Sequence, residues 1–355
     1  MTVVEKDPSR ASAPSAPVLA ARGVSCVYTQ AGDVGVFGRK TVKVRAVDDV
    51  TVEIFPNETL AIVGESGCGK TTLARLLLGL MKPAGGAIEF RGKDIRKLSR
   101  QDQEKFHKAV QVVFQDPLSS LNPRMQVHRI IGDIVRLWGG KLAPSAFNHR
   151  VQQILREVEL TPPRLFLERF PHELSGGQRQ RVAIAKAITV EPDLIVADEP
   201  LSALDVSVQG QILDLLRRLK EEFGVGYVLI SHDLEVVRSV ADRVVVMYLG
   251  KVVESGTVDE VFESPRHPYT RSLLGSVLRA DPRAAKQRER TLISGEVPSL
   301  ASVPSGCRFH PRCPVAVDRC SVEVPVDFKV SGTHVALCHR VGEAGVVEQI
   351  EVPVY

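Results

Sequence analysis

A glycine-rich stretch near the start of the chain has the residue types and the spacing that hold phosphate groups. Residues 64–71 read GESGCGKT, which fits the pattern G-x-x-x-x-G-K-[ST], and they follow an apolar segment, TLAIV. Glycines let successive backbone N–H groups turn toward one anion. In this pattern the lysine reaches the β- and γ-phosphates, and the next hydroxyl binds Mg²⁺. The sequence therefore predicts a nucleotide-phosphate site that comprises Gly64, Glu65, Ser66, Gly67, Cys68, Gly69, Lys70, Thr71 and Thr72.

Within this predicted phosphate loop, Cys68 is interpreted as a small filler rather than a nucleophile, and Thr71 as the Mg²⁺ ligand. Residues 70–80, KTTLARLLLGL, predict a helix whose positive end faces the anion. We expect this helix to bury Leu73, Leu76, Leu77 and Leu80 on one face. The alternative is a glycine-rich turn before a core helix, which the eight-residue pattern between a strand and a helix disfavours.

Two further apolar segments end in polar residues that suit ATP hydrolysis. Residues 193–200 read DLIVADEP, and a carboxylate at this strand end suits a Mg²⁺ ligand, which we assign to Asp198. Glu199 comes directly after it and suits the polarisation of an attacking water. His232 follows a third strand-like segment, YVLIS, at the sheet edge where open α/β folds bind ligands.

A second anion site is predicted about 110 residues after the first. Residues 172–188 read HELSGGQRQRVAIAKAI, in which Ser175 caps a helix and Gly176 and Gly177 leave its first N–H groups sterically open. Gln178 completes this site. One ATP needs a single phosphate loop, so the second site makes sense if it serves a different nucleotide across a dimer interface.

These motifs together resemble the ATPase subunit of an ABC transporter. The resemblance rests on LSGGQ combined with GESGCGKT, VADEP and SHD in this order, and it covers residues 18–264. It implies an α/β fold: a RecA-like P-loop ABC ATPase core with an inserted helical subdomain at about 115–187, an antiparallel β subdomain and a small Cys-containing C-terminal extension. It also implies a head-to-tail dimer in which ATP lies between Lys70 of one subunit and Ser175–Gly177 of the other.

The same resemblance assigns roles to single positions. Gln115, in VVFQDP, matches the glutamine that senses Mg²⁺ and water and couples to the membrane subunit. Asp205, in SALD, matches the loop that crosses the dimer interface, Glu199 the general base, and His232 the γ-phosphate switch. Tyr28 fits the adenine-stacking aromatic best, with Phe37 as its rival.

Several local stretches resemble the ATPases of oligopeptide/dipeptide importers. They are FQDPLSSLNPRM, DEPLSALDVSVQ, PRHPYTRSLL and SGCRFHPRCPVAVDRC, the last in a family-specific extension over residues 265–355. The resemblance implies a peripheral protein on the cytoplasmic face of the inner membrane. Its partners would be a second ATPase subunit, plausibly a paralogous chain, two permease subunits and an external solute-binding protein. Related systems carry peptides, nickel chelates, sugars or other small molecules, so the solute stays open.

The permease is expected to dock on the early part of the helical subdomain, at Leu118, Leu121 and Met125. The alternative for this stretch is a proline-punctuated loop with two core leucines.

Four of the six cysteines lie within the last 49 residues and could bind a metal. The gaps between Cys307, Cys313, Cys320 and Cys338 are wider than the two to four residues usual in structural zinc sites, whereas iron–sulfur clusters tolerate wide gaps. The resemblance to the peptide-importer extension also favours a [4Fe–4S] cluster. Another metal and four unliganded thiols remain alternatives, and His310, His334 or His339 could replace a ligand.

The composition and net charge of the chain disfavour several other classes of protein. The chain has 355 residues, a net charge of +4 and an N-terminal Pro/Ser/Ala stretch, residues 1–17, that we expect to be disordered. The modest charge does not call for nucleic acid, and we expect no membrane span. A soluble ABC-type ATPase is the less favoured alternative, because such proteins usually carry two ATPase domains or a long coiled coil. A small-molecule kinase would have no use for LSGGQ.

Overall fold

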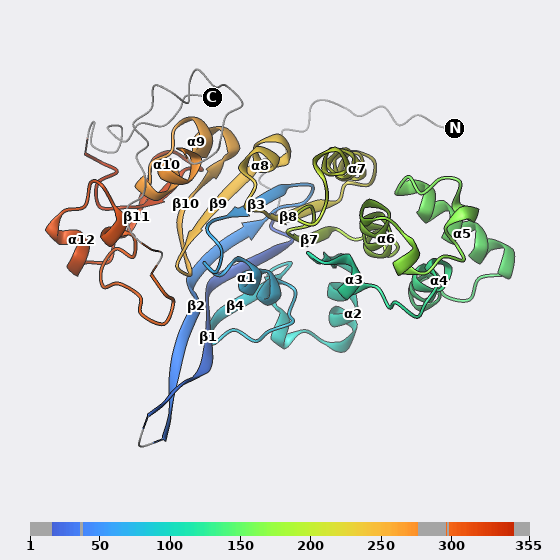
Figure 1. Cartoon of the computed structure of the whole chain (residues 1–355), viewed down its shortest axis with the longest axis horizontal. Helices are drawn as coiled ribbons and strands as arrows, with labels where there is room; N and C mark the ends of the chain where they lie inside the picture. Colours follow the sequence, from blue (N-terminus) through green and yellow to red (C-terminus); the bar gives the residue numbers. More distant parts are fainter. Residues whose placement is uncertain (1–15, 36–37, 276–295, 297, 344–355) are drawn as a thin grey trace.

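Five neighbouring parallel strands form the centre of the structure, a computed structural model that describes residues 16–35, 38–275, 296 and 298–343 (Figure 1). Their side chains are almost all buried, as expected for parallel strands covered on both faces. In spatial order the strands are β9 (Arg243–Tyr248), β3 (Thr59–Val63), β8 (Gly226–Ile230), β7 (Leu194–Asp198) and β6 (Val110–Val113). Most of the predicted tail at 1–17 and the rival aromatic Phe37 lie outside the described residues.

Three antiparallel strands extend this sheet beyond β9. They are β10 (Lys251–Thr257), β12 (Val335–Leu337) and β11 (Asp327–Lys329). Glu254 of β10 pairs with Ala336 of β12, so the C-terminal extension adds strands to the sheet of the ATPase core. The division of the chain at residues 264 and 265, which remains our proposal, therefore crosses one continuous sheet.

A second, four-stranded antiparallel sheet lies beside the first. Its strand order is β2 (Gly38–Ile54), β1 (Leu19–Gly35), β4 (Gly85–Phe90) and β5 (Lys93–Asp94). In Figure 1, β1 and β2 run out of the body of the molecule as a long twisted ribbon. This sheet corresponds to the antiparallel β subdomain of the expected fold.

The segment between β6 and β7 is mostly helical, and its helices lie together on one side of the sheet (Figure 1). They are α3 (Pro117–Ser120), α4 (Val127–Trp138), α5 (Pro144–Glu157), η2 (Pro163–Leu165), η3 (Pro171–Glu173) and α6 (Gly176–Ile188). This is the stretch that the sequence assigns to an inserted helical subdomain.

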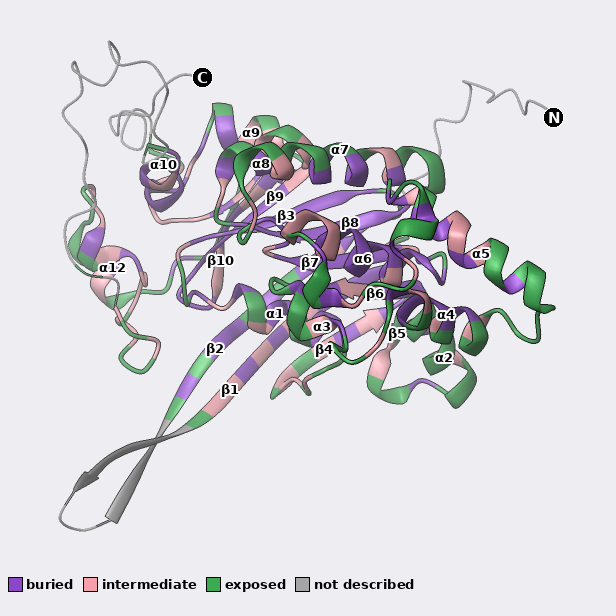
Figure 2. Ribbon diagram, turned by 45° about the vertical axis from the view of Figure 1, so that its right-hand side comes forward, coloured by how far each residue is buried: buried purple, intermediate pink, exposed green. Residues whose placement is uncertain are grey.

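The remaining helices connect and cover the strands. They are α1 (Lys70–Leu77), η1 (Ile95–Lys97), α2 (Arg100–Ala109), α7 (Val206–Phe223), α8 (Leu234–Val240), α9 (Val258–Glu263), α10 (Pro268–Gly275), η4 (His310–Arg312) and α12 (Asp318–Val322). Figure 2 shows that α7 is purple toward the sheet and green toward solvent, which is the amphipathic pattern of a covering helix.

Buried apolar side chains form three groups, one for each region of the fold. The first joins the helical region to one face of the central sheet, the second joins the antiparallel sheet to α1, and the third joins β9 and β10 to the C-terminal extension. Two expectations need correction here. Leu80 lies beyond the end of α1 and is 60% exposed, and Leu121 is a core residue at 2%, whereas Leu118 is exposed.

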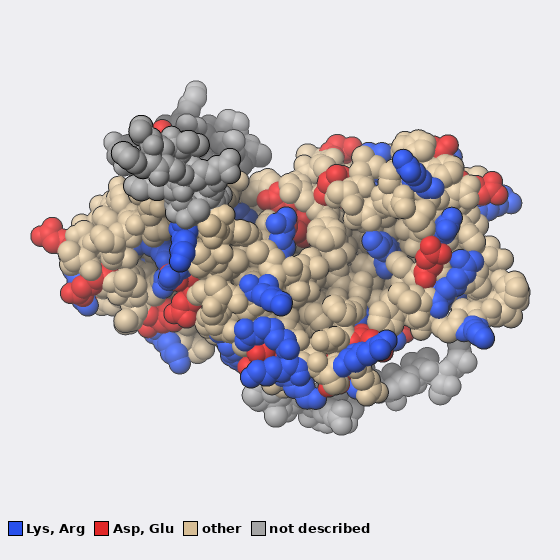
Figure 3. Space-filling view, turned by 90° about the horizontal axis from the view of Figure 1, so that it is seen from below, with Lys and Arg blue, Asp and Glu red and all other residues tan. Residues whose placement is uncertain are grey.

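Charges of both signs are interspersed on the face of the molecule seen in Figure 3. The ion pairs of the described residues include Arg129 with Asp133 and Arg91 with Asp193. In the described residues no helix has both the length and the apolar character needed to cross a bilayer.

The contact between α4 and α5 leaves no room for a methyl group at Gly132. A Cβ there would lie 2.6 Å from Cζ of Phe147, whose ring is also contacted by Arg136 and His128. We expect Gly132→Ala to lower the free energy of unfolding by about 1–3 kcal/mol, as overpacking does, measured by urea denaturation.

Gly210, in α7, provides the matched control because nothing lies within 4 Å of its Cβ position. Gly210→Ala should instead stabilise the protein by about 0.5–1 kcal/mol, since it reduces the entropy of the unfolded chain. Equal effects of the two substitutions would contradict the packing described here.

Candidate nucleotide site

The phosphate loop lies at the carboxyl end of β3, between the two sheets. A Cβ on Gly64 would lie 2.2 Å from the carbonyl oxygen of Met247, and one on Gly69 would lie 2.2 Å from that of Ala46. Both glycines also have positive φ, 149° and 111°. A side chain at either position is therefore excluded by both conformation and space.

Helix α1 begins at this loop with an N-terminus that no side chain caps. Its N-cap residue is Gly69, and its first turn contains no acidic residue, whereas α2 and α7 are capped by Ser99 and Asp205. The first N–H groups of a helix need a partner, and the positive end of the helix dipole favours an anion. The geometry fits the predicted phosphate site.

Lys70 is buried and points back along the loop. Its Nζ donates hydrogen bonds to the carbonyl oxygens of Gly64 at 2.8 Å and Glu65 at 3.0 Å. Cys68 is buried beneath it, and burial raises the pKa of the Cys68 thiol. A buried thiol of raised pKa is a poor nucleophile, consistent with the interpretation of Cys68 as a filler.

Two of the three predicted Mg²⁺ ligands, Thr71 and Asp198, lie side by side. The Thr71 hydroxyl donates to Oδ1 of Asp198 at 3.3 Å, although the two residues are 127 positions apart. Asp198 ends β7, is buried, and forms no ion pair within the described part of the chain. Burial raises the pKa of the Asp198 carboxyl, and the hydrogen bond from Thr71 partly opposes this shift. A buried carboxylate beside a hydroxyl provides the oxygen ligands that a divalent metal ion favours.

Glu199 lies between the two other predicted catalytic residues. Nε2 of Gln115 donates to Oε2 of Glu199 at 2.9 Å, and Nδ1 of His232 lies 3.3 Å from Oε1. The three residues follow β7, β6 and β8, whose carboxyl ends meet at one edge of the sheet. The structure thus brings Gln115, Glu199 and His232 together beside Asp198.

The second predicted anion site is a helix cap at the start of α6. Ser175 accepts a hydrogen bond from the N–H of Gln178 at 3.3 Å, and the Gln178 side chain accepts one from the N–H of Ser175 at 3.0 Å. A Cβ on Gly177 would lie 2.5 Å from Val208 of α7. The close approach of α7 is therefore a second reason for glycine at this position, which the sequence did not indicate.

The cap at Ser175–Gln178 does not contact the phosphate loop of the same chain, residues 64–72, through a hydrogen bond or an ion pair in the described residues. Asp205, which caps α7 by accepting from the N–H of Val208, is likewise apart, and a hydrogen bond from Ser207 holds the pKa of its carboxyl below the usual range.

Tyr28 contacts the site from β1. Its hydroxyl lies 3.2 Å from Oγ1 of Thr72 and donates to Sδ of Met81 at 3.3 Å. The ring packs partly against the core of the antiparallel sheet. The adenine-stacking role of Tyr28 stays a prediction.

The four clustered cysteines line one small cavity. Cys307, Cys313, Cys320 and Cys338 line a cavity of about 10 Å³, which is at the lower limit for holding a single water. All four are free thiols, and burial raises the pKa of Cys313 to about 12 and of Cys338 to about 11. Among the described residues, no group of three or more His, Cys, Asp or Glu has the arrangement that a single metal ion needs.

The histidines proposed as substitute ligands differ in their surroundings. His310 and His339 line the cavity, whereas His334 is buried elsewhere, with Nε2 2.7 Å from Oε1 of Glu254. His334 is therefore committed to a carboxylate and not to the cysteines.

Sequence reasoning missed a residue that contacts the phosphate loop from the C-terminal extension. Arg312 forms a two-point ion pair with the Glu65 carboxylate, with N–O distances of 2.8 and 3.0 Å. The two positions are 247 residues apart, and no local pattern links them.

Comparison with known proteins agrees with this geometry. A family model described as ABC transporter matches residues 47–202, and one described as oligopeptide/dipeptide transporter, C-terminal region, matches residues 253–320. The oligopeptide transport ATP-binding protein AppF of Bacillus subtilis is 47% identical over 86% of this chain and 92% of its own length. OppF of Salmonella typhimurium is 45% identical over 85% of this chain and 89% of its own length.

Two solved structures share the fold. CbiO1 from Clostridium perfringens, part of an ABC transporter complex, has a TM-score of 0.59 and 29% identity, covering 70% of this chain and 92% of its own. The ATP-binding cassette MJ0796, solved as a dimer with ADP and Pi, has a TM-score of 0.58 and 27% identity, covering 68% of this chain and 98% of its own. The chain therefore belongs to the ABC transporter family, among the ATP-binding proteins of oligopeptide transport.

Proposed function

We propose that this chain is the ATP-hydrolysing subunit of an importer that carries oligopeptides across the cytoplasmic membrane. The observation that carries the proposal is Glu199, held between Gln115 and His232 and beside the Thr71–Asp198 pair. Relatives at 45–47% identity bear the name oligopeptide transport ATP-binding protein, which supports the peptide as solute.

In this proposal Glu199 accepts a proton from the attacking water. Its side chain is 20% exposed, so water can reach it, while Gln115 and His232 contact its two carboxylate oxygens. Lys70 exchanges its two carbonyl partners for phosphate oxygens, and the uncapped N–H groups of α1 contact the same anion. Tyr28 stacks on the adenine.

Thr71, Asp198 and Gln115 would hold Mg²⁺ at this site. When bound, Mg²⁺ neutralises part of the negative charge on the phosphates. The fit rests on the oxygen donors of Thr71 and on the buried carboxylate of Asp198, which lacks an ion-pair partner among the described residues.

The cap at Ser175–Gln178 serves the nucleotide of a second ATPase subunit. Ser175, Gly176, Gly177 and Gln178 begin α6, and Asp205 begins α7 beside them. MJ0796 was solved as a dimer, which supports a pair of ATPase subunits. In our proposal the pair is head-to-tail, so that these residues complete the neighbour's site. The second subunit is a copy of this chain or a paralogue.

The remaining partners are two permease subunits and an external solute-binding protein. Leu118 is exposed next to Gln115 and suits contact with a permease, whereas Leu121 belongs to the core. Docking on the permeases places the chain on the cytoplasmic face of the membrane, as a peripheral protein with no nucleic-acid partner. The relatives are named as oligopeptide transport proteins, which favours peptides over nickel chelates or sugars as the transported solute.

We also propose that Cys307, Cys313, Cys320 and Cys338 hold a [4Fe–4S] cluster. The support is that four thiols line one cavity. Burial raises the pKa of Cys313 and Cys338, and a bound metal would favour their deprotonated form. The cluster's position outside the nucleotide residues suits a structural or regulatory role.

Glu199→Gln tests the assignment of the base. The substitution keeps the shape of the side chain but removes its proton-accepting capacity, so hydrolysis should fall by about 10²–10⁴-fold in a steady-state phosphate-release assay. Nucleotide affinity should stay within about twofold. Glu104→Gln, on the exposed surface of α2, is the control and should hydrolyse ATP normally; wild-type turnover by Glu199→Gln would mean that another group is the base.

Ser175→Arg tests the role of the second cap. In the Glu199→Gln background, ATP should drive dimerisation of the full-length chain, alone or with its partner ATPase, and Ser175→Arg should abolish this dimer in size-exclusion chromatography. Ser99→Arg is the matched control, since Ser99 caps α2 in the same way and its loss costs a similar ~1 kcal/mol of helix stability. A normal ATP-dependent dimer of Ser175→Arg would exclude a dimer in which ATP lies between Lys70 of one subunit and Ser175 of the other.

Anaerobic purification tests the cluster. The protein should be brown, with visible absorbance from sulfur-to-iron charge transfer and about four irons per chain. Cys313→Ser should lose both, while Cys26→Ser, at a buried cysteine of β1, should keep them. Colourless protein without iron would contradict the cluster, and about one zinc per chain would indicate a zinc site in its place.

A further inference from the structure

The phosphate loop is held from outside the ATPase motifs by a residue of the C-terminal extension. Nη1 of Arg312 donates to Oε2 of Glu65 at 2.8 Å, and Nη2 donates to Oε1 at 3.0 Å. The Arg312 side chain is 7% exposed and that of Glu65 is 23% exposed. A two-point arginine–carboxylate pair of this burial fixes both position and orientation.

The backbone of Glu65 is held at the same time by its neighbours. Its N–H donates to the Tyr269 hydroxyl at 2.9 Å, and its carbonyl oxygen accepts from Lys70 at 3.0 Å. Tyr269 packs against Tyr248 and Phe309, and the guanidinium of Arg312 lies over the rings of both of these. Tyr269 and Arg312 of the extension thus contact the loop, and Phe309 packs against both of them.

Electrostatics make the pair relevant to nucleotide binding. Glu65 places a carboxylate on a loop whose N–H groups and lysine otherwise attract a polyanion. An unpaired carboxylate there would repel the phosphates. Arg312 cancels that charge within the protein.

We infer that Arg312 is a positioning residue of the nucleotide site, which neutralises Glu65 and holds the phosphate loop in its binding conformation from the C-terminal extension. This inference rests on the proposed ATPase function and deepens it. A loop already ordered before the ligand arrives loses less conformational entropy on binding, so the pair contributes to affinity in two ways.

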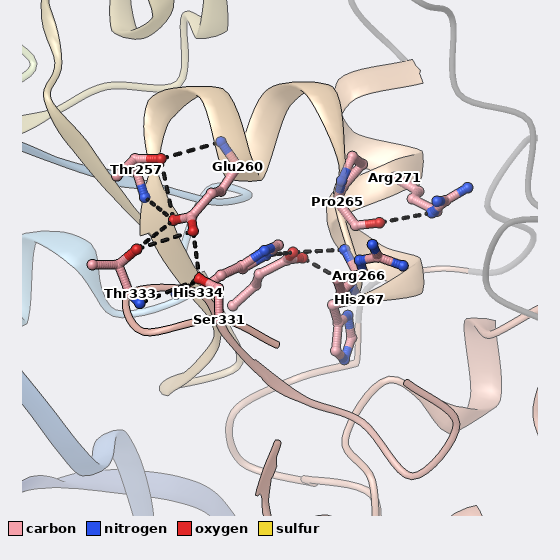
Figure 4. Close-up of polar contacts among 10 residues, drawn as sticks. Thr257, Glu260, Pro265, Arg266, His267, Arg271, Ser331, Thr333 and His334 are labelled. Carbon is pink, nitrogen blue, oxygen red and sulfur yellow. Dashed lines mark hydrogen bonds and ion pairs between the residues drawn. The ribbon is translucent and has the colours of Figure 1, made fainter. Parts of the chain in front are cut away.

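Other contacts anchor the extension without Arg312. The buried His334 lies with Nε2 2.7 Å from Oε1 of Glu254. Figure 4 shows Glu260 of α9 accepting hydrogen bonds from Ser331 and Thr333. These bonds hold Glu260 ionised, with its pKa lowered to about 2. Arg308 also pairs with Asp48. A substitution at Arg312 should therefore leave the extension docked, and its effect can be measured at the loop.

The test measures binding of a fluorescent ATP analogue to the full-length chain. Arg312→Gln should weaken affinity by about tenfold, within the range of couplings between sites, and the loss should shrink at high salt. Arg312→Lys, which keeps the charge but not the two-point geometry, should lose about two- to threefold. In steady-state hydrolysis the KM should rise while kcat stays within about twofold, because Glu199 and its neighbours are untouched.

Adding Glu65→Gln to Arg312→Gln should restore affinity to within about twofold of wild type, because it removes the uncompensated charge. A merely structural role for Arg312 would not be rescued in this way. Arg319→Gln, at an exposed arginine of the same extension that pairs with Glu323, is the control and should bind normally.

The outcomes separate this inference from the proposed function. Wild-type affinity of Arg312→Gln, together with lost binding by Lys70→Ala, would overturn the inference alone. Wild-type affinity of Lys70→Ala would overturn the phosphate-loop assignment itself. Weak binding by Arg312→Gln that Glu65→Gln fails to restore would refute charge neutralisation.

Discussion

The approach of the phosphate loop to two backbone carbonyl groups is the constraint on which the rest of the site depends. Gly64 lies against Met247 of β9, and Gly69 lies against Ala46 of β2. These strands belong to different sheets, so the loop can take its conformation only where both sheets are in place. The N-terminus of α1 is thereby fixed in direction, and its first N–H groups remain available to an anion because no side chain caps them.

Within this frame the site's three carboxylates are compensated in three different ways. Glu65 has a guanidinium, Glu199 has an amide and an imidazole, and Asp198 has a hydroxyl. Asp198 is the most buried of the three and lacks an ion pair among the described residues. A buried carboxylate is costly without a positive charge, so this position is where a divalent cation gains most. The different roles proposed for these neighbouring acids thus follow from what each one contacts.

Much of this site could be predicted from the sequence, because its parts lie at strand ends and helix starts that carry local patterns. The cap at Ser175 and the position of Asp198 at the end of β7 both follow from a few adjacent residues. The role of Gly177 against Val208 and the burial of Leu121 depend on packing between helices, which local periodicity does not record. Arg312 was missed for the same reason, since its partner is 247 positions away.

The C-terminal extension is linked to the nucleotide site through a shared core as well as through one ion pair. Phe309 packs with Tyr248 of β9 and Tyr269 of α10, and two cysteines of the cavity, Cys307 and Cys313, flank the segment that carries Arg312. A ligand that orders this segment also favours the loop conformation that Arg312 holds. Linkage is reciprocal, so if a ligand of the cysteine cavity raised the affinity for nucleotide in this way, nucleotide would raise the affinity of the cavity for that ligand by the same factor. The extension and the phosphate loop are thus in direct contact, although most of the ATPase fold lies between them in the chain.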